Sequence, residues 1–308
     1  MTNILITGGA GFVAGSLAEK LAENKDYFIV IVDNLVTGSL SKVPALPNCK
    51  FIKADVNVFN DIYPIMTAYK FDYVFHYAAL VGVLRTLEQP VNVLNDIPGI
   101  KNILDLSKNT GVKRVFFSSS SEVYGEPVEF PQNEKTTPLN SRLPYAVVKN
   151  VGEAFLRSYQ HEYGLDYTIF RFFNTYGYKQ SRDFVVAKFL KAALNNEDIT
   201  IYGDGNQSRT FCYIDDNIEA TIKCFENGLY VNDVINLGND VETTVLDLAK
   251  IIIKATNSKS KIIHVPALKE GDMTRRKPDI TNMRKILNRD LVPLETGINK
   301  ILNQISKL

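Results

Sequence analysis

A glycine-rich stretch near the start of the chain restricts the possible folds more than any other feature of the sequence. The letters TGGAGFVAG follow directly on the apolar run 4–6. Glycines between a strand and a helix let the backbone approach a pyrophosphate, and the helix N-terminus adds N–H donors and a positive dipole end. We expect Gly8 and Gly11 to form this turn, with Phe12 and Val13 at the start of the helix.

Short apolar runs alternate with helical stretches over the first half of the chain. The runs fall at 4–6, 28–32, 51–52, 73–75, 115–117 and 167–170, and long helices are expected near 95–109 and 145–163. Runs this apolar suit strands that are buried on both faces of a sheet. The alternation predicts an α/β fold with a Rossmann-like, doubly wound parallel sheet.

The pattern changes past about residue 178, where loops, helices and short strands follow one another. The length of 308 residues also suggests two lobes, at roughly 150 residues per domain. We therefore expect an NAD-type Rossmann domain over residues 1–177, with a returning segment near 212–238, and a smaller C-terminal α/β substrate lobe over residues 178–308.

A carboxylate at the end of the second predicted strand bears on the choice of cofactor. Asp33 lies 22 residues after Gly11, and Asn34 follows it. A carboxylate there can accept hydrogen bonds from both hydroxyls of an adenosine ribose and would repel a 2′-phosphate, which favours NAD over NADP. Asp55, after the third strand, is placed to bind the adenine, with Val56 beside it. The alternative for both carboxylates is a turn residue after a strand.

Tyr145 and Lys149 stand four residues apart, a spacing that puts them on one face of a helix. Oxidation of an alcohol by nicotinamide needs a base for the hydroxyl proton, but a free tyrosine, with a pKa of about 10, is a poor base at pH 7. A neighbouring ammonium and the positive nicotinamide ring favour the phenolate. Lys149 can also hold the nicotinamide ribose, and a serine of the run 118–121 can orient the reacting hydroxyl.

Several motifs, in order, resemble the extended short-chain dehydrogenase/reductase family and its NAD-dependent nucleotide-sugar epimerases, dehydratases and decarboxylases. They are TGGAGF, VDN, HYAA, SSSSEVYG, YAVVK, RFFNTYG, YGDGNQSRTFCYIDD and RRKPDI, and they extend over nearly the whole chain. The resemblance implies that Ser120, Tyr145 and Lys149 form the catalytic trio. It also places Ala78 and Ala79 of HYAA at the cofactor, and we expect the histidine of that motif to be structural.

The same resemblance implies a set of substrate-binding residues. Asn174, Arg209 and Arg276 match positions that hold the substrate's diphosphate, a role that suits guanidinium groups because they pair with phosphate oxygens in a bidentate way. A surface ion pair is the alternative for either arginine. Segments that should border the sugar or wrap the nucleotide base contribute Val83, Arg85, Val185 and Tyr202.

In the enzymes that the chain resembles, NAD oxidises C4 of the sugar to a 4-keto intermediate, whose fate differs. Glu122 could abstract the acidified C5 proton, and a glutamate here is typical of dehydratases and decarboxylases. Ser121 stands where the commonest dehydratases have aspartate. We favour a nucleotide-sugar 4-epimerase. A 4,6-dehydratase or decarboxylase that uses Glu122, a C4 dehydrogenase that releases the keto-sugar, and a GDP-sugar substrate remain alternatives, and a dinucleotide-sensing regulatory protein is the alternative outside enzymes.

The net charge, the cysteines and the first residues of the chain bear on the partners and the location of the protein. The net charge of +1 gives no reason to expect nucleic acid or a membrane as a partner. Cys49, Cys212 and Cys224 lack metal-site or disulfide spacing, so we expect reduced thiols and no metal. No secretory signal opens the sequence, which predicts a cytoplasmic enzyme. The resemblance implies a homodimer, or a tetramer, that pairs the helices near 95–109 and 145–163.

Overall fold

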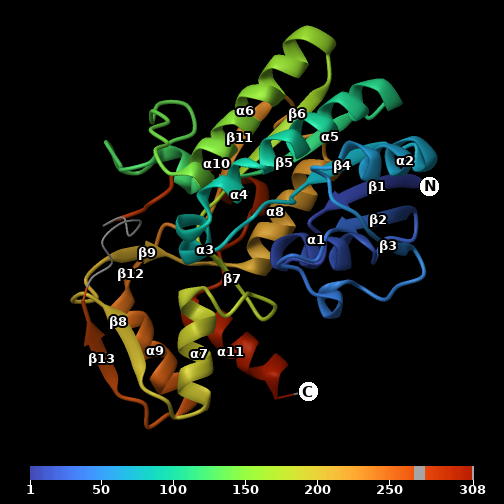
Figure 1. The fold of residues 1–308 in the computed structure, drawn as a ribbon. Coiled ribbons are helices and arrows are strands. Elements are labelled where there is room, and N and C mark those ends of the chain that lie inside the picture. The colour runs from blue at the N-terminus through green and yellow to red at the C-terminus, as the bar shows by residue number, and fades with distance from the viewer. Residues whose placement is uncertain (267–274, 307–308) are drawn as a thin grey trace. The chain divides into compact units, whose positions relative to one another are not determined.

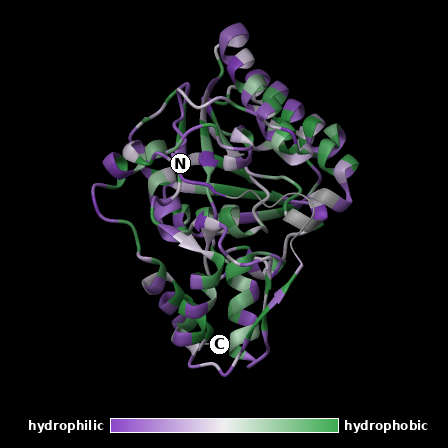
Figure 2. Cartoon of the chain, turned by 90° about the vertical axis from the view of Figure 1, so that its left-hand side faces the viewer, coloured by the Kyte–Doolittle hydropathy of each residue, from purple (hydrophilic) through white to green (hydrophobic). Residues whose placement is uncertain are grey.

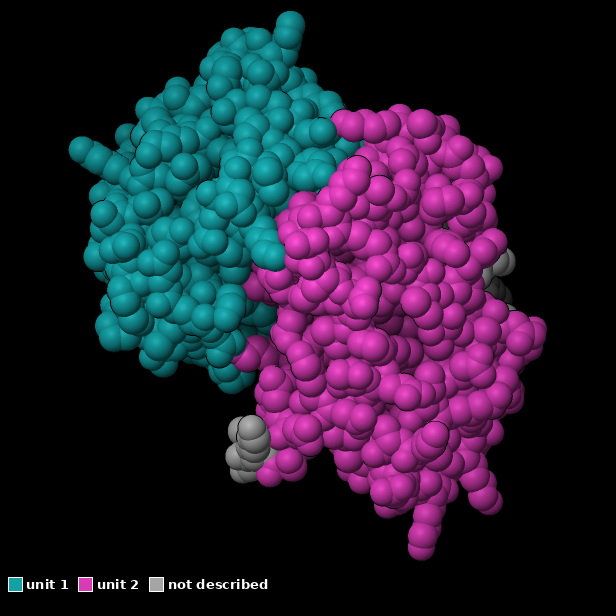
Figure 3. All heavy atoms as spheres, turned by 180° about the vertical axis from the view of Figure 1, so that it is seen from behind, with its two compact units in different colours: residues 1–125, 139–171, 221–235 teal, residues 126–138, 172–220, 236–308 magenta. Residues whose placement is uncertain are grey.

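The computed structural model describes residues 1–266 and 275–306. The chain divides into two compact units, which Figure 3 draws in different colours. Unit 1 comprises residues 1–125, 139–171 and 221–235, and unit 2 comprises residues 126–138, 172–220 and 236–308. Each unit is therefore built from several separate stretches of the chain.

A seven-stranded sheet, formed mainly by unit 1, has the order β11-β6-β5-β4-β1-β2-β3 (Figure 1). Its strands are β1 (Thr2–Thr7), β2 (Tyr27–Asp33), β3 (Cys49–Lys53), β4 (Tyr73–His76), β5 (Arg114–Ser120), β6 (Asp166–Phe172) and β11 (Asp233–Leu237). The pairs β1–β2, β1–β4, β2–β3 and β4–β5 are parallel. The order runs outward from β1 in both directions, as in doubly wound folds. The predicted fold class is confirmed.

The helices of unit 1 connect these strands. They are α1 (Phe12–Leu21), α2 (Phe59–Tyr69), α3 (Val83–Glu88), α4 (Pro90–Leu94), α5 (Asp96–Thr110) and α6 (Pro144–Tyr163), with the 3₁₀ turns η1 (Leu40–Lys42) and η2 (Ser121–Tyr124). Pro144 occupies the first position of α6, where its missing N–H costs nothing, and left-handed glycines end α5 and α6. The helices α5 and α6 pack side by side (Figure 1).

The core of unit 1 lies on the sheet, because its strands carry apolar side chains on both faces. All the residues from Ile29 to Val32 on β2 are fully buried. Phe75, Phe116 and Phe170, from three adjacent strands, stack with ring-centre distances of 4.4 and 6.1 Å. Figure 2, which colours the chain by hydropathy, shows green, hydrophobic strands in the interior. The apolar runs in the sequence predicted the strands for this reason.

Unit 2 contains short strands and helices, as expected from the looser sequence pattern. Three two-stranded sheets pair β7 (Thr175–Tyr176) with β10 (Cys212–Tyr213), β8 (Ile199–Tyr202) with β13 (Ile262–Val265), and β9 (Ser208–Thr210) with β12 (Glu242–Thr244). Its helices are α7 (Val185–Leu194), α9 (Val245–Thr256), α10 (Thr281–Leu287) and α11 (Leu294–Ile305), and α8 (Ile214–Glu226) belongs partly to each unit.

The division of the chain differs from the predicted boundary at residue 177. Unit 2 includes the segment 126–138, its next stretch begins at residue 172 rather than 178, and it contains residues 212–220 of the predicted returning segment. That segment bonds to later parts of unit 2: Gln132 exchanges backbone hydrogen bonds of 2.8 Å with Lys277 and Asp279, and Glu134 accepts one of 3.0 Å from the Asn236 N–H. The segment is polar and carries no apolar period, so nothing in the sequence indicated these distant partners.

Candidate active site

The glycine-rich turn follows β1 and leads into α1. Gly8 has a φ of +72° and donates a 2.7 Å hydrogen bond to the Val32 carbonyl. A Cβ on Gly8 would come within 2.8 Å of the Ala78 backbone, so both the conformation and the space require glycine. Gly11 caps α1 without a side-chain hydrogen bond, and the first turn of this helix holds no acidic residue. The N–H groups at this helix end therefore suit a phosphate. That first turn includes the predicted residues Phe12 and Val13.

The loop after β2 is organised by Asp33, which is buried at the strand's end. Its two carboxylate oxygens accept backbone hydrogen bonds from Ala10 at 3.0 Å and Leu35 at 2.8 Å. Asn34 donates to the carboxylate of Asp55 at 3.0 Å. Each oxygen of Asp33 retains a further lone pair for a ribose hydroxyl, so the side chain fits both its structural role and the predicted cofactor role.

The loop after β4 lies against β1. The Thr7 hydroxyl accepts the backbone N–H of Ala78 at 3.1 Å and pairs with Nδ1 of His76 at 2.9 Å. Burial, with a smaller contribution from the charge of Lys149, lowers the pKa of His76 to about 3. The imidazole is therefore neutral at pH 7 and serves the structural hydrogen bond. The predicted cofactor residues of this loop, Ala78 and Ala79, are both partly buried.

Three other predicted residues of unit 1 lie near these loops in the sequence. Val56 is buried directly after Asp55. Arg85, on α3, is partly buried and donates a hydrogen bond of 2.9 Å to the Val81 carbonyl. Val83 begins α3, but its side chain is outside the described part of the structure.

Tyr145 and Lys149 lie one turn apart near the start of α6. Lys149 is only 3% exposed, and its Nζ donates to the Ser118 hydroxyl at 3.3 Å and lies 5.8 Å from the centre of the Tyr145 ring. Burial lowers the pKa of Lys149 to about 8, although the negative charge of Asp96 acts in the opposite direction. The ammonium is therefore still charged near neutral pH, in a place where water screens it little.

Ser120 and Glu122 are held by the short turn that follows β5. Ser120 is the last residue of the strand, and its hydroxyl accepts the backbone N–H of Glu122 at 3.2 Å. This hydrogen bond caps η2 and leaves the O–H of Ser120 available as a donor. Ser118, Tyr145 and Lys149 are thus brought together by β5 and α6. Ser120 lies two residues beyond Ser118, at the carboxyl end of β5, which is the edge of the sheet where ligands of doubly wound folds bind.

Sequence reasoning missed two residues here. Ser118, rather than one of its three serine neighbours, contacts Lys149. Asp96, at the start of α5, accepts a hydrogen bond of 2.7 Å from the Leu80 N–H and acts electrostatically on Lys149. Its position in the first turn of a long helix was visible in the sequence, but an acidic residue there is also an ordinary helix feature.

The predicted substrate residues of unit 2 lie on separate elements. Asn174 has a φ of +24°, and its Nδ2 is buried without a hydrogen-bond partner in the described residues. Arg209, in β9, donates to the Ser208 carbonyl at 2.7 Å, and Arg276 is buried. Val185 begins α7 and Tyr202 ends β8. The unpaired amide of Asn174 is the feature among these that fits a polar ligand, because an unsatisfied buried donor is costly.

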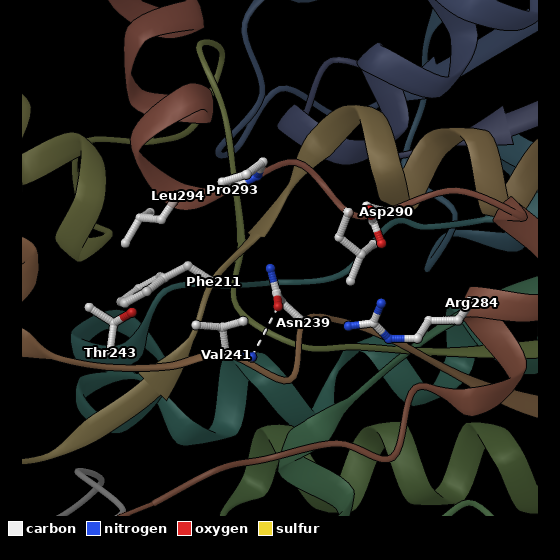
Figure 4. A pocket seen from close by; sticks show the side chains of 9 residues that line it. Phe211, Asn239, Val241, Thr243, Arg284, Asp290, Pro293 and Leu294 are labelled. Atoms are coloured by element: carbon white, nitrogen blue, oxygen red, sulfur yellow. Dashed lines mark hydrogen bonds between the residues drawn. The ribbon is translucent and has the colours of Figure 1, made fainter.

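Unit 2 also contains a cavity of about 270 Å³ that the sequence did not predict (Figure 4). Its lining is mainly apolar, with the amide of Asn239 and the guanidinium of Arg284 among the polar groups. Asn239 Oδ1 accepts a hydrogen bond of 3.0 Å from the Val241 N–H. The five predicted substrate residues are absent from its described lining, which consists of Phe211, Asn239, Val241, Thr243, Arg284, Asp290, Leu291, Pro293 and Leu294.

Residues 1–266 and 275–306 contain neither a cluster of metal ligands nor a membrane-spanning helix. No group of three or more His, Cys, Asp or Glu side chains in this part of the chain could hold a metal ion. None of its helices is both long and apolar enough to cross a bilayer. The three cysteines are free thiols, and Cys212 and Cys224 are buried.

The sequence model of the NAD dependent epimerase/dehydratase family matches residues 4–238. The chain belongs to this family. The predicted family membership is therefore confirmed, and with it the predictions that the chain is an enzyme and that its cofactor is NAD.

Curated relatives cover almost the full chain. A putative UDP-glucose 4-epimerase of Methanocaldococcus jannaschii is 33% identical over 97% of both chains. A UDP-N-acetyl-alpha-D-glucosaminuronate decarboxylase of Bacillus cytotoxicus is 34% identical over 92% of this chain and 90% of its own. Both act on nucleotide sugars by their names, the class of substrate that the sequence predicted.

A solved structure gives the same result. The UDP-glucose 4-epimerase of Thermotoga maritima, solved with UDP-glucose, is 32% identical over 99% of both chains and has a TM-score of 0.93. The similarity thus extends through both units.

Proposed function

We propose that this enzyme is a UDP-sugar 4-epimerase, which inverts C4 of the sugar through a 4-keto intermediate. The observation that carries the proposal is the buried, charged Lys149, held by Ser118 and close to the Tyr145 ring. The epimerases of Methanocaldococcus jannaschii and Thermotoga maritima support the choice of UDP-sugar and reaction.

NAD, when bound, supplies the acceptor and donor for the C4 hydrogen. The residues of the glycine turn fit its pyrophosphate, because Gly8 permits close backbone approach and the N-terminus of α1 is open to an anion. Asp33 would bind the adenosine ribose, and the loops after β3 and β4 would line the rest of the cofactor. The residues proposed for these loops are Asn34, Asp55, Val56, Ala78 and Ala79.

The chemistry would take place at Tyr145. Its phenolate would accept the proton of the C4 hydroxyl, and Ser120 would orient that hydroxyl with its free O–H. Lys149 would stabilise the phenolate by its charge and bind the nicotinamide ribose. After the keto-sugar has rotated to present its other face, the hydride would return to C4 on that face and Tyr145 would return the proton to the C4 oxygen, which completes the inversion.

The nucleotide and the sugar would be bound by the residues that the sequence predicted for them. The unpaired Nδ2 of Asn174 would donate to the diphosphate, and Arg209 and Arg276 would neutralise its charge. Val185 and Tyr202 would contact the uracil. Val83 and Arg85 would border the sugar.

Decarboxylation of a UDP-uronic acid is a second candidate. Glu122 lies in η2, two residues from Ser120, where a carboxylate could act on C5 of the sugar. The decarboxylase of Bacillus cytotoxicus supports this alternative, as do several UDP-glucuronic acid decarboxylases from Arabidopsis thaliana.

A substrate panel tests both candidates. The protein is incubated with NAD and, separately, UDP-glucose, UDP-N-acetylglucosamine and UDP-glucuronate, with GDP-glucose and dTDP-glucose for comparison, and products are identified by NMR. We expect one UDP-sugar to give its C4 epimer without release of CO₂. Release of CO₂ from UDP-glucuronate would establish the second candidate instead, and turnover of only the GDP- or dTDP-sugar would contradict the proposed substrate.

Location and assembly are further parts of the proposal. The unpaired, buried thiols of Cys212 and Cys224 suit a reducing compartment, so we propose a cytoplasmic enzyme that supplies polysaccharide biosynthesis. We also propose a homodimer, or a tetramer built from such dimers, through α5 and α6, which lie side by side on unit 1. Light scattering of the purified protein tests the assembly.

A further inference from the structure

A fully buried ion pair joins α6 to β6. Glu153 lies one turn beyond Lys149 on α6 and is 0% exposed. Its two carboxylate oxygens accept hydrogen bonds from Nε and Nη2 of Arg171 at 2.8 and 2.7 Å. Arg171 lies on β6 and is 1% exposed. The pair is therefore bidentate, the most geometrically restrictive form of an arginine–carboxylate contact.

The same pair also binds both sides of the turn that follows β5. Nη1 of Arg171 donates to the Tyr124 hydroxyl at 2.8 Å, and the guanidinium lies 4.8 Å from the centre of that ring. The Ser119 hydroxyl donates to Glu153 at 2.6 Å. Ser119 and Tyr124 directly flank the stretch 120–123, which contains Ser120 and Glu122.

Stability alone does not account for burying these charges. Desolvation of two ions costs several kcal/mol each, and well-packed apolar residues in the place of a buried pair are often as stable. Burial opposes ionisation of Glu153, but the hydrogen bonds and charge of Arg171 hold its pKa below the ordinary value. What the pair offers, and apolar side chains do not, is a fixed direction for each of its hydrogen bonds.

We propose that Glu153, Arg171 and Tyr124 are positioning residues for the reaction. They hold the turn that bears Ser120 and Glu122 at a fixed place relative to α6, which bears Tyr145 and Lys149. Misplacement of a reacting group by about 1 Å can cost on the order of 10²-fold in rate, so the network acts on turnover without touching substrate. This inference rests on the proposed function.

The test compares two mild variants with a matched control. Tyr124→Phe removes one hydroxyl from the network, and Arg171→Lys keeps the charge but loses the bidentate geometry. The control is Arg157→Gln, because Arg157 also contacts Glu153, at 3.2 Å, but its side chain is 45% exposed and lies outside the buried pair. Turnover is measured per NAD-binding site, well below the unfolding temperature, and NAD affinity is measured separately.

We expect kcat to fall about 10-fold in Tyr124→Phe and about 100-fold in Arg171→Lys, with the dissociation constant for NAD within about twofold of wild type. Arg157→Gln should retain wild-type kcat. Amide hydrogen exchange of residues 118–125 should accelerate in the first two variants only. A purely structural role would lower the unfolding temperature and leave kcat per site unchanged, and that result would overturn the inference.

The outcomes separate this inference from the proposed function. If wild-type protein converts no UDP-sugar, the proposed function fails before any variant is compared, and unchanged hydrogen exchange in Tyr124→Phe then overturns the inference as well. If wild-type protein is active and Tyr124→Phe equals it in kcat, the inference alone fails. If Arg171→Lys does not fold, Tyr124→Phe decides the question, because loss of one hydroxyl preserves the packing of the ring. Equal losses of kcat and NAD affinity would indicate general damage and would also count against positioning.

Discussion

Replacement of Lys149 by methionine should make the protein more stable and almost inactive. The pKa of Lys149 falls from 10.5 to about 8 in the folded chain, mainly because the ammonium is buried. A pKa difference of that size means that the buried charge lowers the free energy of unfolding by about 3 kcal/mol. Methionine fills a similar volume without charge, and loss of the hydrogen bond to Ser118 offsets about 1 kcal/mol. We therefore expect a gain of about 1–3 kcal/mol at pH 7.

The lowered pKa of Lys149 also predicts how the stability difference between the variant and wild type changes with pH. Below pH 8, lysine is protonated in the folded and unfolded chains alike, so the full cost of burial applies. As the pH rises from 8 towards 10.5, the folded chain loses the proton first and the cost decreases. The advantage of Lys149→Met should therefore be largest below pH 8 and shrink steadily above it.

The assay is urea unfolding of the NAD-free protein at pH 7 and at pH 9.5, with Lys20→Met as control. Lys20 is exposed and forms a surface ion pair with Glu23, so its replacement should change stability by less than about 0.5 kcal/mol. Turnover of Lys149→Met should fall by a factor on the order of 10²–10⁴. A variant that is less stable than wild type at pH 7, or a difference that does not depend on pH, would refute the reasoning.

Three other changes test the proposed roles. Tyr145→Phe should lower kcat by a factor on the order of 10²–10⁴ while NAD still binds, as measured by turnover and calorimetry, and unchanged turnover would remove Tyr145 as the base. Asp33→Ala should weaken NAD more than NADP, because the carboxylate would bind the ribose hydroxyls and repel a 2′-phosphate; equal losses by titration would contradict this role. Glu122→Gln should leave a 4-epimerase active, whereas a decarboxylase or dehydratase would lose exchange of C5 hydrogen with deuterated water, as measured by NMR.

Most of the sheet could be predicted from the sequence because β1, β2, β4, β5 and β6 are largely buried on both faces and therefore apolar. The spacing of Tyr145 and Lys149 likewise fixed their common helix face. The partner of Lys149 could not be predicted, since four consecutive serines present the same side chain and only the course of β5 selects Ser118. The buried ion pair was indicated by Arg171, because an arginine within an apolar strand needs a buried partner of opposite charge.

Apolar periodicity, on which the predicted domain boundary rested, does not account for how the chain segments are divided between the two units. Apolar periodicity marks elements that pack on a sheet, and it located the elements of unit 1. The segment 126–138 is instead joined to unit 2 by hydrogen bonds, such as that between Asn133 and Asp279 at 2.9 Å. This bond connects residues that are 146 positions apart in the sequence, and no local sequence pattern indicates it.

The interleaving of the two units limits how this enzyme can be re-engineered. The chain passes from one unit to the other after residues 125, 138, 171, 220 and 235. A chimaera made with a single crossover would thus combine pieces of both parents within one unit. Expression of residues 236–308 alone would omit two of the three stretches of unit 2, and a longer C-terminal fragment would include strands that belong to unit 1. Transfer of a new nucleotide preference, which we propose for residues of unit 2, therefore calls for grafting of individual side chains, or for exchange of the three stretches of unit 2 at once.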